Sequence, residues 1–234
     1  MSSDLQQFIA NLSICDTHEH MKKEQDWLDF KPDLLCELFQ NYVPADLVVA
    51  GASAEALKRL LDPNEPDIEK RFEGVRTAWE AVTHTGYGEA GNLCGLLARY
   101  PKARFVLMHI AYPYDDEIVA LAKHYPNVWV DMCWAWSINP HASAQFVRRF
   151  LHAAPVNKLF GFGGDTSRPR AAVAYALQCR KWLTKALQAE VDEGELTEAQ
   201  AIAVARRLLQ ENQGACFDLE GVRRRISEQM ARER

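Results

Sequence analysis

The 234-residue sequence predicts an α/β fold in which parallel strands alternate with helices, with further helices at both ends. Beyond Pro101, apolar runs of strand length alternate with amphipathic segments of helix length, and short loops join them. Each expected strand is an almost continuous apolar run, which is typical of strands buried on both faces of a parallel sheet. Strands are expected over 104–110, 127–133 and 158–163, and helices over 115–125 and 141–153.

The composition predicts one globular domain over residues 1–234. With 48% hydrophobic and 25% charged residues, a chain of this length can bury a sizeable core. Four parts are expected in order, namely a first strand (1–22), a mainly helical part (23–100), strand-helix units (101–168) and C-terminal helices (169–234). The formal net charge of −5 provides no basic field for nucleic acid, so a small-molecule substrate is the expected partner.

The sequence carries no signal for a membrane or for a disulfide framework. No apolar run reaches the roughly 18 residues that a membrane span needs, and no basic-then-apolar leader opens the chain. The six cysteines form no Cys-x-x-Cys pair and lie mostly within apolar runs, which indicates reduced packing residues. The sequence therefore predicts a cytoplasmic protein without membrane contact.

The segment 14–20 contains the main chemical signal, which is formed by Asp16, His18 and His20. In an extended strand, residues two apart share a face, so these side chains are expected to point the same way. Two neutral imidazoles close together can hold one metal ion, with further ligands from elsewhere in the fold. The alternative is a polar strand end whose histidines hydrogen-bond to neighbours. Two histidines on one face beside an aspartate favour the metal site.

Most of the first hundred residues outside this strand have apolar residues at helical spacing. Pro32 lies where a helix can begin. The run 46–51 ends in a glycine and fits either a short strand or a helix end, and no strand is expected between residues 52 and 103. Helices are expected over 3–12, 27–42, 52–61 and 67–82.

Chemically active residues follow two of the later strands. His109 lies at the end of the first of them, and Asp165 follows the last one directly. In parallel strand-helix folds, sites form at this carboxyl end of the strands. A hydrogen-bonded core histidine is an equally good interpretation of His109, and a helix cap is the alternative for Asp165. Three glycines within 161–164 indicate a close approach of backbone or ligand, which a simple cap does not require.

The C-terminal part is expected to be helical. One helix is expected over 170–187, and a second is opened by Thr197 with Gln200 three residues on, the spacing of a capping box, and runs to residue 212. The last stretch, 219–234, contains the basic run 223–225. We interpret that run as the solvated face of a charged helix.

The motif Asp16-x-His18-x-His20 on an early strand resembles the first-strand signature of the amidohydrolase superfamily. The resemblance is to the amidohydrolase-related branch that includes aminocarboxymuconate semialdehyde decarboxylase. The segment 97–131 is similar to the sixth and seventh strand-helix units of that branch, and 160–165 looks like the eighth-strand segment that ends in the family's essential aspartate. The similarity is loose over the first twenty residues and close over 92–212.

By this resemblance, His18 and His20 are metal ligands, and Asp165 is both a ligand and a proton acceptor from water. His109 matches the sixth-strand histidine that orients substrate or moves protons. The implied cofactor is a divalent metal. Two imidazoles and a carboxylate favour zinc, and manganese is the alternative.

The resemblance implies a partial or shortened TIM-like (β/α) barrel. A complete barrel needs eight parallel strands and typically about 250 residues, and this sequence lacks convincing counterparts of strands two to five. The family's fifth-strand histidine ligand lies in that gap. His84 is the nearest replacement, although a surface histidine is the favoured interpretation. Trp134, Trp136 and Asn139 follow the seventh strand, where they either line a pocket or pack as ordinary aromatic and loop residues.

The first, sixth, seventh and eighth strands are neighbours in a closed barrel, so the shortened sheet is expected to stay contiguous. We therefore expect His18, His20, His109 and Asp165 to converge in one region of coordination size. An open half-sheet leaves strand edges unpaired, and either the helices of 27–82 cover them or a second copy does. A homo-oligomer is the favoured outcome.

The expected function is a metal-dependent hydrolase that activates water to cleave a C–N, ester or lactone bond in a small molecule. Two alternatives remain, a decarboxylase (a lyase) of the same fold and a shortened relative without catalysis that acts as a binding or assembly module. Because the fifth-strand ligand is missing, weak metal binding and low turnover are expected.

Overall fold

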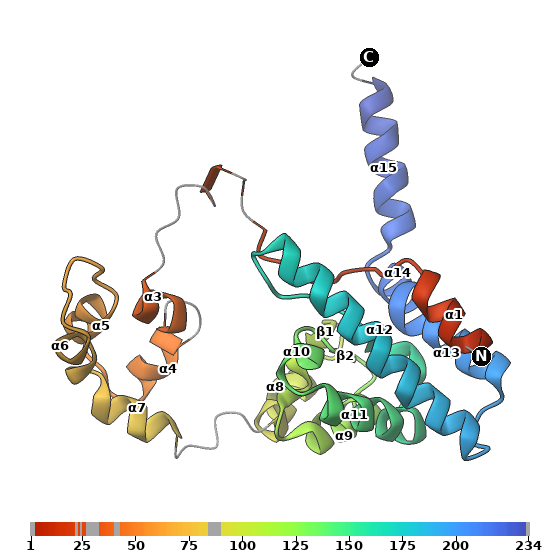
Figure 1. Cartoon of the computed structure of the whole chain (residues 1–234), viewed down its shortest axis with the longest axis horizontal. Coiled ribbons are helices and arrows are strands. Elements are labelled where there is room, and N and C mark those ends of the chain that lie inside the picture. Colours follow the sequence, from red (N-terminus) through yellow and green to blue (C-terminus); the bar gives the residue numbers. More distant parts are fainter. Residues whose placement is uncertain are drawn as a thin grey trace. The chain divides into compact units, whose positions relative to one another are not determined.

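A computed structural model describes residues 3–21, 23, 25–26, 33–39, 43–83 and 90–232. The chain divides into two compact units, which are Met1–Met21 with Glu89–Arg234 (unit 1) and Lys22–Gly88 (unit 2) (Figure 1). No helix in the described part combines the length and the apolar character that a membrane span requires. The assignment of residues 1–234 to one domain stays a prediction.

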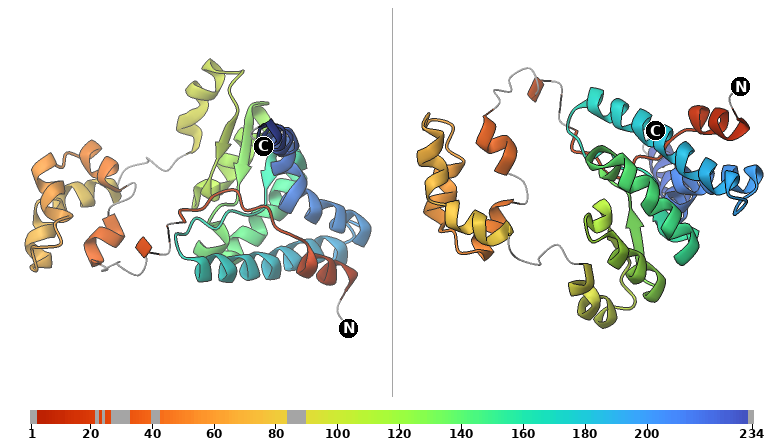
Figure 2. Two further views of the ribbon diagram at one scale, coloured as in Figure 1. Left: turned by 90° about the horizontal axis from the view of Figure 1, so that it is seen from above. Right: turned by 60° about the horizontal axis from the view of Figure 1, so that its bottom comes forward.

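Unit 1 contains a parallel three-stranded sheet, which confirms the predicted α/β fold class. Its strands are β1 (Phe105–Leu107), β2 (Val128–Asp131) and β3 (Leu159–Phe160), in the order β1-β2-β3. Val106 pairs with Trp129, and Val130 pairs with Leu159. Both β2 and β3 are buried, because helices flank them (Figure 2).

Helices connect the strands as the alternating pattern predicts. α9 (Asp115–His124) begins with three acidic residues and ends with Lys123 and His124, which suits the helix dipole. α11 (Pro140–Ala153) begins with proline at its first position after the N-cap Asn139. α11 packs on both α9 and the long α12 (Pro169–Asp192). The shorter elements are η1 (Ala90–Leu93), α8 (Cys94–Arg99), η2 (His109–Ala111), α10 (Ala135–Ile138) and η3 (Val156–Lys158).

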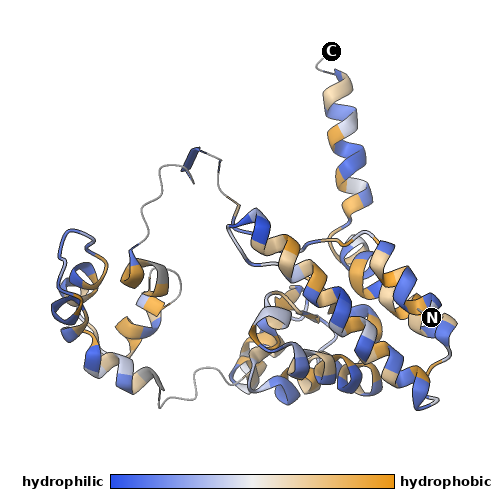
Figure 3. Cartoon of the chain, viewed as in Figure 1, coloured by the Kyte–Doolittle hydropathy of each residue, from blue (hydrophilic) through white to orange (hydrophobic). Residues whose placement is uncertain are grey.

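The two ends of unit 1 meet where α1 (Asp4–Asn11) packs on α12 and on α13 (Glu198–Arg206). The predicted capping box is present. The side chain of Thr197 accepts from Gln200 N, and Gln200 Oε1 accepts from Thr197 N. The chain continues through η4 (Arg207–Glu211) and α14 (Asn212–Cys216) into α15 (Leu219–Arg232). α15 is mostly hydrophilic, with a few hydrophobic residues between (Figure 3), and its basic run 223–225 is exposed, as predicted.

Unit 2 is helical and has a core of its own. Its helices are α3 (Leu34–Phe39), α4 (Val43–Val49), α5 (Ala54–Leu60), α6 (Ile68–Glu73) and α7 (Arg76–Thr83). Buried Arg71 donates to both carboxylate oxygens of Asp33, at 2.7 and 2.6 Å, and to Leu60 O at 3.0 Å. This bidentate pair joins α3 to α5 and α6. The segment 46–51, which fitted either a short strand or a helix end, is a helix end, because α4 ends just before Gly51, which has a φ of 103°.

Several expected boundaries differ from the structure. The helix expected over 67–82 is divided at Gly74, whose missing side chain lets the backbone approach Ala56 of α5. The segment 14–20 is extended but forms no strand, because its backbone hydrogen bonds go to Leu209, Phe162 and Thr166 without a regular ladder. Much of the helix expected over 27–42 lies outside the described residues.

Candidate metal centre

The segment 14–20 lies beside the segment that follows β3. Thr17 donates to Phe162 O through both its backbone amide, at 3.3 Å, and its hydroxyl, at 2.8 Å. Cys15 N donates to Leu209 O at 2.8 Å. These contacts bring the N-terminal motif to the carboxyl end of the sheet, although the motif is not itself a strand.

Three consecutive amides around Asp165 are held by the N-terminal motif. As a result, Asp165 keeps a left-handed backbone with a φ of 49°, a conformation that costs free energy in a non-glycine residue. The hydrogen bonds are Gly164 N to Asp16 Oδ1 at 3.1 Å, Asp165 N to His18 O at 2.9 Å, and Thr166 N to Glu19 Oε2 at 2.9 Å. The motif therefore positions the aspartate as well as supplying imidazoles.

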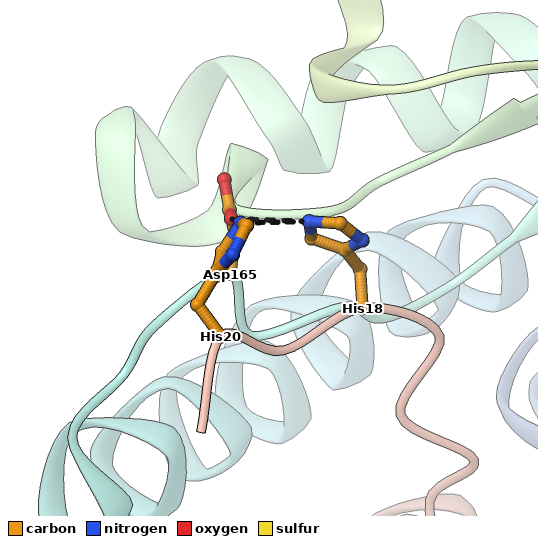
Figure 4. Close-up of side chains that lie close together, drawn as sticks. All are labelled: His18, His20 and Asp165. Carbon is orange, nitrogen blue, oxygen red and sulfur yellow. Dashed lines mark hydrogen bonds and ion pairs between the residues drawn. The ribbon is translucent and has the colours of Figure 1, made fainter. Parts of the chain in front are cut away.

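The side chains of His18, His20 and Asp165 point toward one another (Figure 4). Asp165 Oδ1 lies 3.4 Å from His18 Nε2 and 3.0 Å from His20 Nε2, and the two Nε2 atoms are 3.0 Å apart. Ligands that bind zinc at about 2.0–2.1 Å in a tetrahedron are about 3.3–3.4 Å from one another. The three ligand atoms therefore fit a single divalent cation.

His109 lies on the other side of the same carboxylate. Its Nε2 is 3.8 Å from Asp165 Oδ2, and its Nδ1 lies 3.0 Å from Cys133 O. Because a carbonyl oxygen only accepts hydrogen bonds, Nδ1 is the donor, and the lone pair of the neutral ring is on Nε2. β1 ends at Leu107, so His109 follows the strand in a turn with a φ of 65°.

Two further carboxyl groups belong to this region, and neither was among the residues predicted from the sequence. Asp131, at the end of β2, is 1% exposed. Burial raises its pKa to about 7, although the neighbouring Thr17 hydroxyl and the Cys133 amide, which donates to Oδ1 at 2.9 Å, act in the opposite direction. Burial and the neighbouring Asp16 carboxylate raise the pKa of Glu19 to about 7. The only sequence signal for Glu19 is its place between the two histidines.

The glycines of 161–164 make room for the chain's own residues. A Cβ on Gly164 would overlap with Glu19 Oε1, and one on Gly163 would lie 2.6 Å from Thr17 Oγ1 and 3.0 Å from Cys133 Sγ. Close approach was expected here, and its cause is the packing of the N-terminal motif and of Cys133 against this segment.

The aromatic residues after β2 divide between packing and surface. Trp136 is 1% exposed, and its indole donates to Gly161 O at 2.8 Å, so it is a core residue. Trp134 is 43% exposed, and its ring centroid lies 6.2 Å from that of His109. Asn139 caps α11 and donates to the Tyr112 hydroxyl at 3.3 Å. His84 lies outside the described residues.

Two histidines and an aspartate at the carboxyl end of a parallel sheet define a class of α/β proteins able to bind a divalent metal. Residues 23–208 match the family model described as amidohydrolase, and the chain belongs to the amidohydrolase family. The matched range contains His109 and Asp165, and it begins after His18 and His20.

Two known proteins are similar to this chain. Protein fluG from Emericella nidulans is 30% identical over 146 residues, which cover 58% of this chain and 17% of the fungal protein. A solved structure described as a metal-dependent hydrolase from Lactobacillus casei matches with a TM-score of 0.47 and 16% identity, over 92% of this chain and 63% of the other. The chain therefore spans less than two thirds of either relative.

Proposed function

We propose that this chain is a metal-dependent hydrolase that holds one divalent cation between His18, His20 and Asp165. The observation that supports this most directly is that the three ligand atoms lie 3.0 to 3.4 Å from one another. Membership of the amidohydrolase family favours the same type of function. Two imidazoles and one carboxylate suit zinc, and three protein ligands with one open position form a recognised catalytic zinc set. No fifth-strand ligand is required for such a set.

The chemistry that a bound cation supplies is Lewis acidity, which lowers the pKa of water from 15.7 to about 7. Asp165 accepts the proton of the attacking water, since its carboxylate lies within reach of the centre and is 12% exposed. His109 Nε2 carries a lone pair toward Asp165 Oδ2 and therefore relays the proton to the leaving group. We propose a C–N, ester or lactone bond in a small molecule as the bond that is cleaved.

Solvent reaches the centre from the sides of His20 and His109, whose side chains are 54% and 35% exposed, and the exposed ring of Trp134 lies beside His109. The family match gives no support to the decarboxylase or to a non-catalytic module, and the homo-oligomer and the cytoplasmic location stay predictions.

The test is an assay of the zinc-loaded chain on a panel of amides, esters and lactones. Turnover on one class is expected, and His18→Ala and Asp165→Asn should abolish it. His124→Ala is the matched control, because His124 is an exposed histidine at the end of α9. Turnover that survives His18→Ala and Asp165→Asn would refute the proposed centre.

A further inference from the structure

The two oxygens of the Asp165 carboxylate have different neighbours. Oδ1 faces His18 and His20, and Oδ2 faces His109 Nε2 at 3.8 Å. On the Oδ2 side lies a second group of possible metal ligands, formed by His109, Cys133 and Asp165. Each of the three offers one ligand atom, and these atoms lie within 4.8 Å of one another.

We propose that His109, Cys133 and Asp165 form a second, inhibitory cation site that selects thiophilic divalent metals. This inference rests on the proposed function for its inhibitory effect, because Asp165 is shared and His109 is the proposed proton relay. The ligand set of imidazole, thiolate and carboxylate suits zinc, cadmium and cobalt, since thiolate is a soft ligand.

The imidazole of His109 is already oriented as a ligand. Its Nδ1 donates to Cys133 O at 3.0 Å, which fixes the tautomer and leaves the Nε2 lone pair toward Asp165. Metal-binding histidines commonly donate their second N–H to a carbonyl or carboxylate in this way. The same hydrogen bond ties His109 to the residue that carries the thiol.

The backbone of Cys133 is held from both ends. Its amide donates to Asp131 Oδ1 at 2.9 Å, and its carbonyl accepts from His109 Nδ1 and from Ala135 N. The missing side chain at Gly163 leaves room for Sγ, because a Cβ there would lie 3.0 Å from it. The backbone that carries the thiol is therefore held on both sides of Cys133, and the thiol lies against Gly163.

The surroundings of Cys133 are electrostatically unlike those of an apolar packing cysteine. The side chain is fully buried, and burial, together with the carboxyl groups of Asp131, Asp165, Asp16 and Glu19, raises the pKa of its thiol. The carboxylates of Asp16 and Asp165 supply negative charge here, which attracts a cation. When the cation binds, the thiol releases its proton to bulk water, and the thiolate and the Asp165 carboxylate offset the added charge.

Occupation of this site has a direct consequence for the proposed reaction. A cation there binds His109 Nε2 and Asp165 Oδ2, which are the atoms that must accept and relay the proton. Hydrolysis is therefore expected to rise with the first equivalent of metal and to fall as the second equivalent binds.

Cadmium tests this site, because a cadmium–thiolate bond gives a charge-transfer band in the ultraviolet. We expect the full chain to bind two equivalents in equilibrium dialysis, with the band rising as the second one binds. Cys133→Ala should lose the band and one equivalent. Cys179→Ala is the matched control, since Cys179 is also fully buried but belongs to no group of possible metal ligands among the described residues. This variant should keep both the band and the two equivalents of cadmium.

Two outcomes separate this inference from the proposed function. A wild-type chain that binds cadmium without the band, or a band that persists in Cys133→Ala, would overturn the second site and leave the first intact. A band that disappears in Cys133→Ala would support the second site. If His18→Ala bound as many equivalents as the wild type, that separate result would refute the first site and leave the second supported.

Discussion

The amide of Thr166 donates a hydrogen bond of 2.9 Å to Glu19 Oε2, which ties the residue between the two motif histidines to the residue after Asp165. The other oxygen of Glu19 is buried beside Gly164 and has no hydrogen-bond partner among the described residues. The motif therefore has two tasks, since it carries imidazoles and also holds the backbone that presents Asp165. Variants that disturb this second task should weaken metal binding without removing a ligand.

Gly164→Ala tests this packing. A methyl group at residue 164 would overlap with Glu19 Oε1, so we expect a loss of about 1–3 kcal/mol in the free energy of unfolding. Denaturant titration followed by circular dichroism measures it. The control is Gly95→Ala in α8, where a Cβ meets nothing within 4 Å and a gain of up to about 1 kcal/mol is expected. Equal stability of the two variants would show that Glu19 does not fill this space.

His109→Gln tests the proton relay. Loss of a general acid or base typically costs about 10²–10⁴ in rate, and we expect a fall of this size in kcat on the substrate found by the panel. The first equivalent of zinc should still bind, because His109 is not a ligand of the proposed first site. The measurement is steady-state kinetics together with a zinc count. An unchanged kcat would remove His109 from the reaction.

The Asp33–Arg71 pair predicts how unit 2 responds to acid. Hydrogen bonds from Arg71 and from the Cys36 amide hold the pKa of Asp33 well below its usual range. A carboxyl with a lowered pKa stabilises the fold above its unfolded pKa of about 3.9, and this contribution is lost as the pH falls toward the folded pKa. The denaturation midpoint of the wild type should therefore fall on acidification below about pH 4. The denaturation midpoint of Asp33→Asn should be lower than that of the wild type at neutral pH and should change less on acidification. If the midpoints of the two proteins fell in parallel with pH, the lowered pKa of Asp33 would be contradicted.

Thr197→Ala tests the capping box that opens α13. The hydroxyl of Thr197 accepts a hydrogen bond from Gln200 N, and its loss should lower the free energy of unfolding by about 0.5–2 kcal/mol. Thr197→Ser keeps a hydroxyl and should retain most of this stability. Denaturant unfolding of the three proteins measures the difference. A Ser variant as unstable as the Ala variant would mean that the hydroxyl does not stabilise this end.

The sequence predicted the parts of the fold whose physical cause is local. Strands such as β2 are buried on both faces, so their continuous apolar runs are readable without a structure. The extended shape of 14–20 was also foreseen, but its irregular pairing depends on Leu209 and Phe162, which lie far away in the sequence. Glu19 and Cys133 were not recognised as parts of the site, because one points away from the expected histidine face and the other lies in an apolar run.

The most direct test of the account is the amount of zinc bound at one equivalent per chain. We predict one bound zinc in the wild type and in His124→Ala, and a loss of affinity of more than about 100-fold in each of His18→Ala, His20→Ala and Asp165→Asn, beyond the 10–100-fold typical of outer-shell changes. Equilibrium dialysis with atomic absorption gives the count. Zinc that stays bound with unchanged affinity in all three variants would contradict the proposed centre.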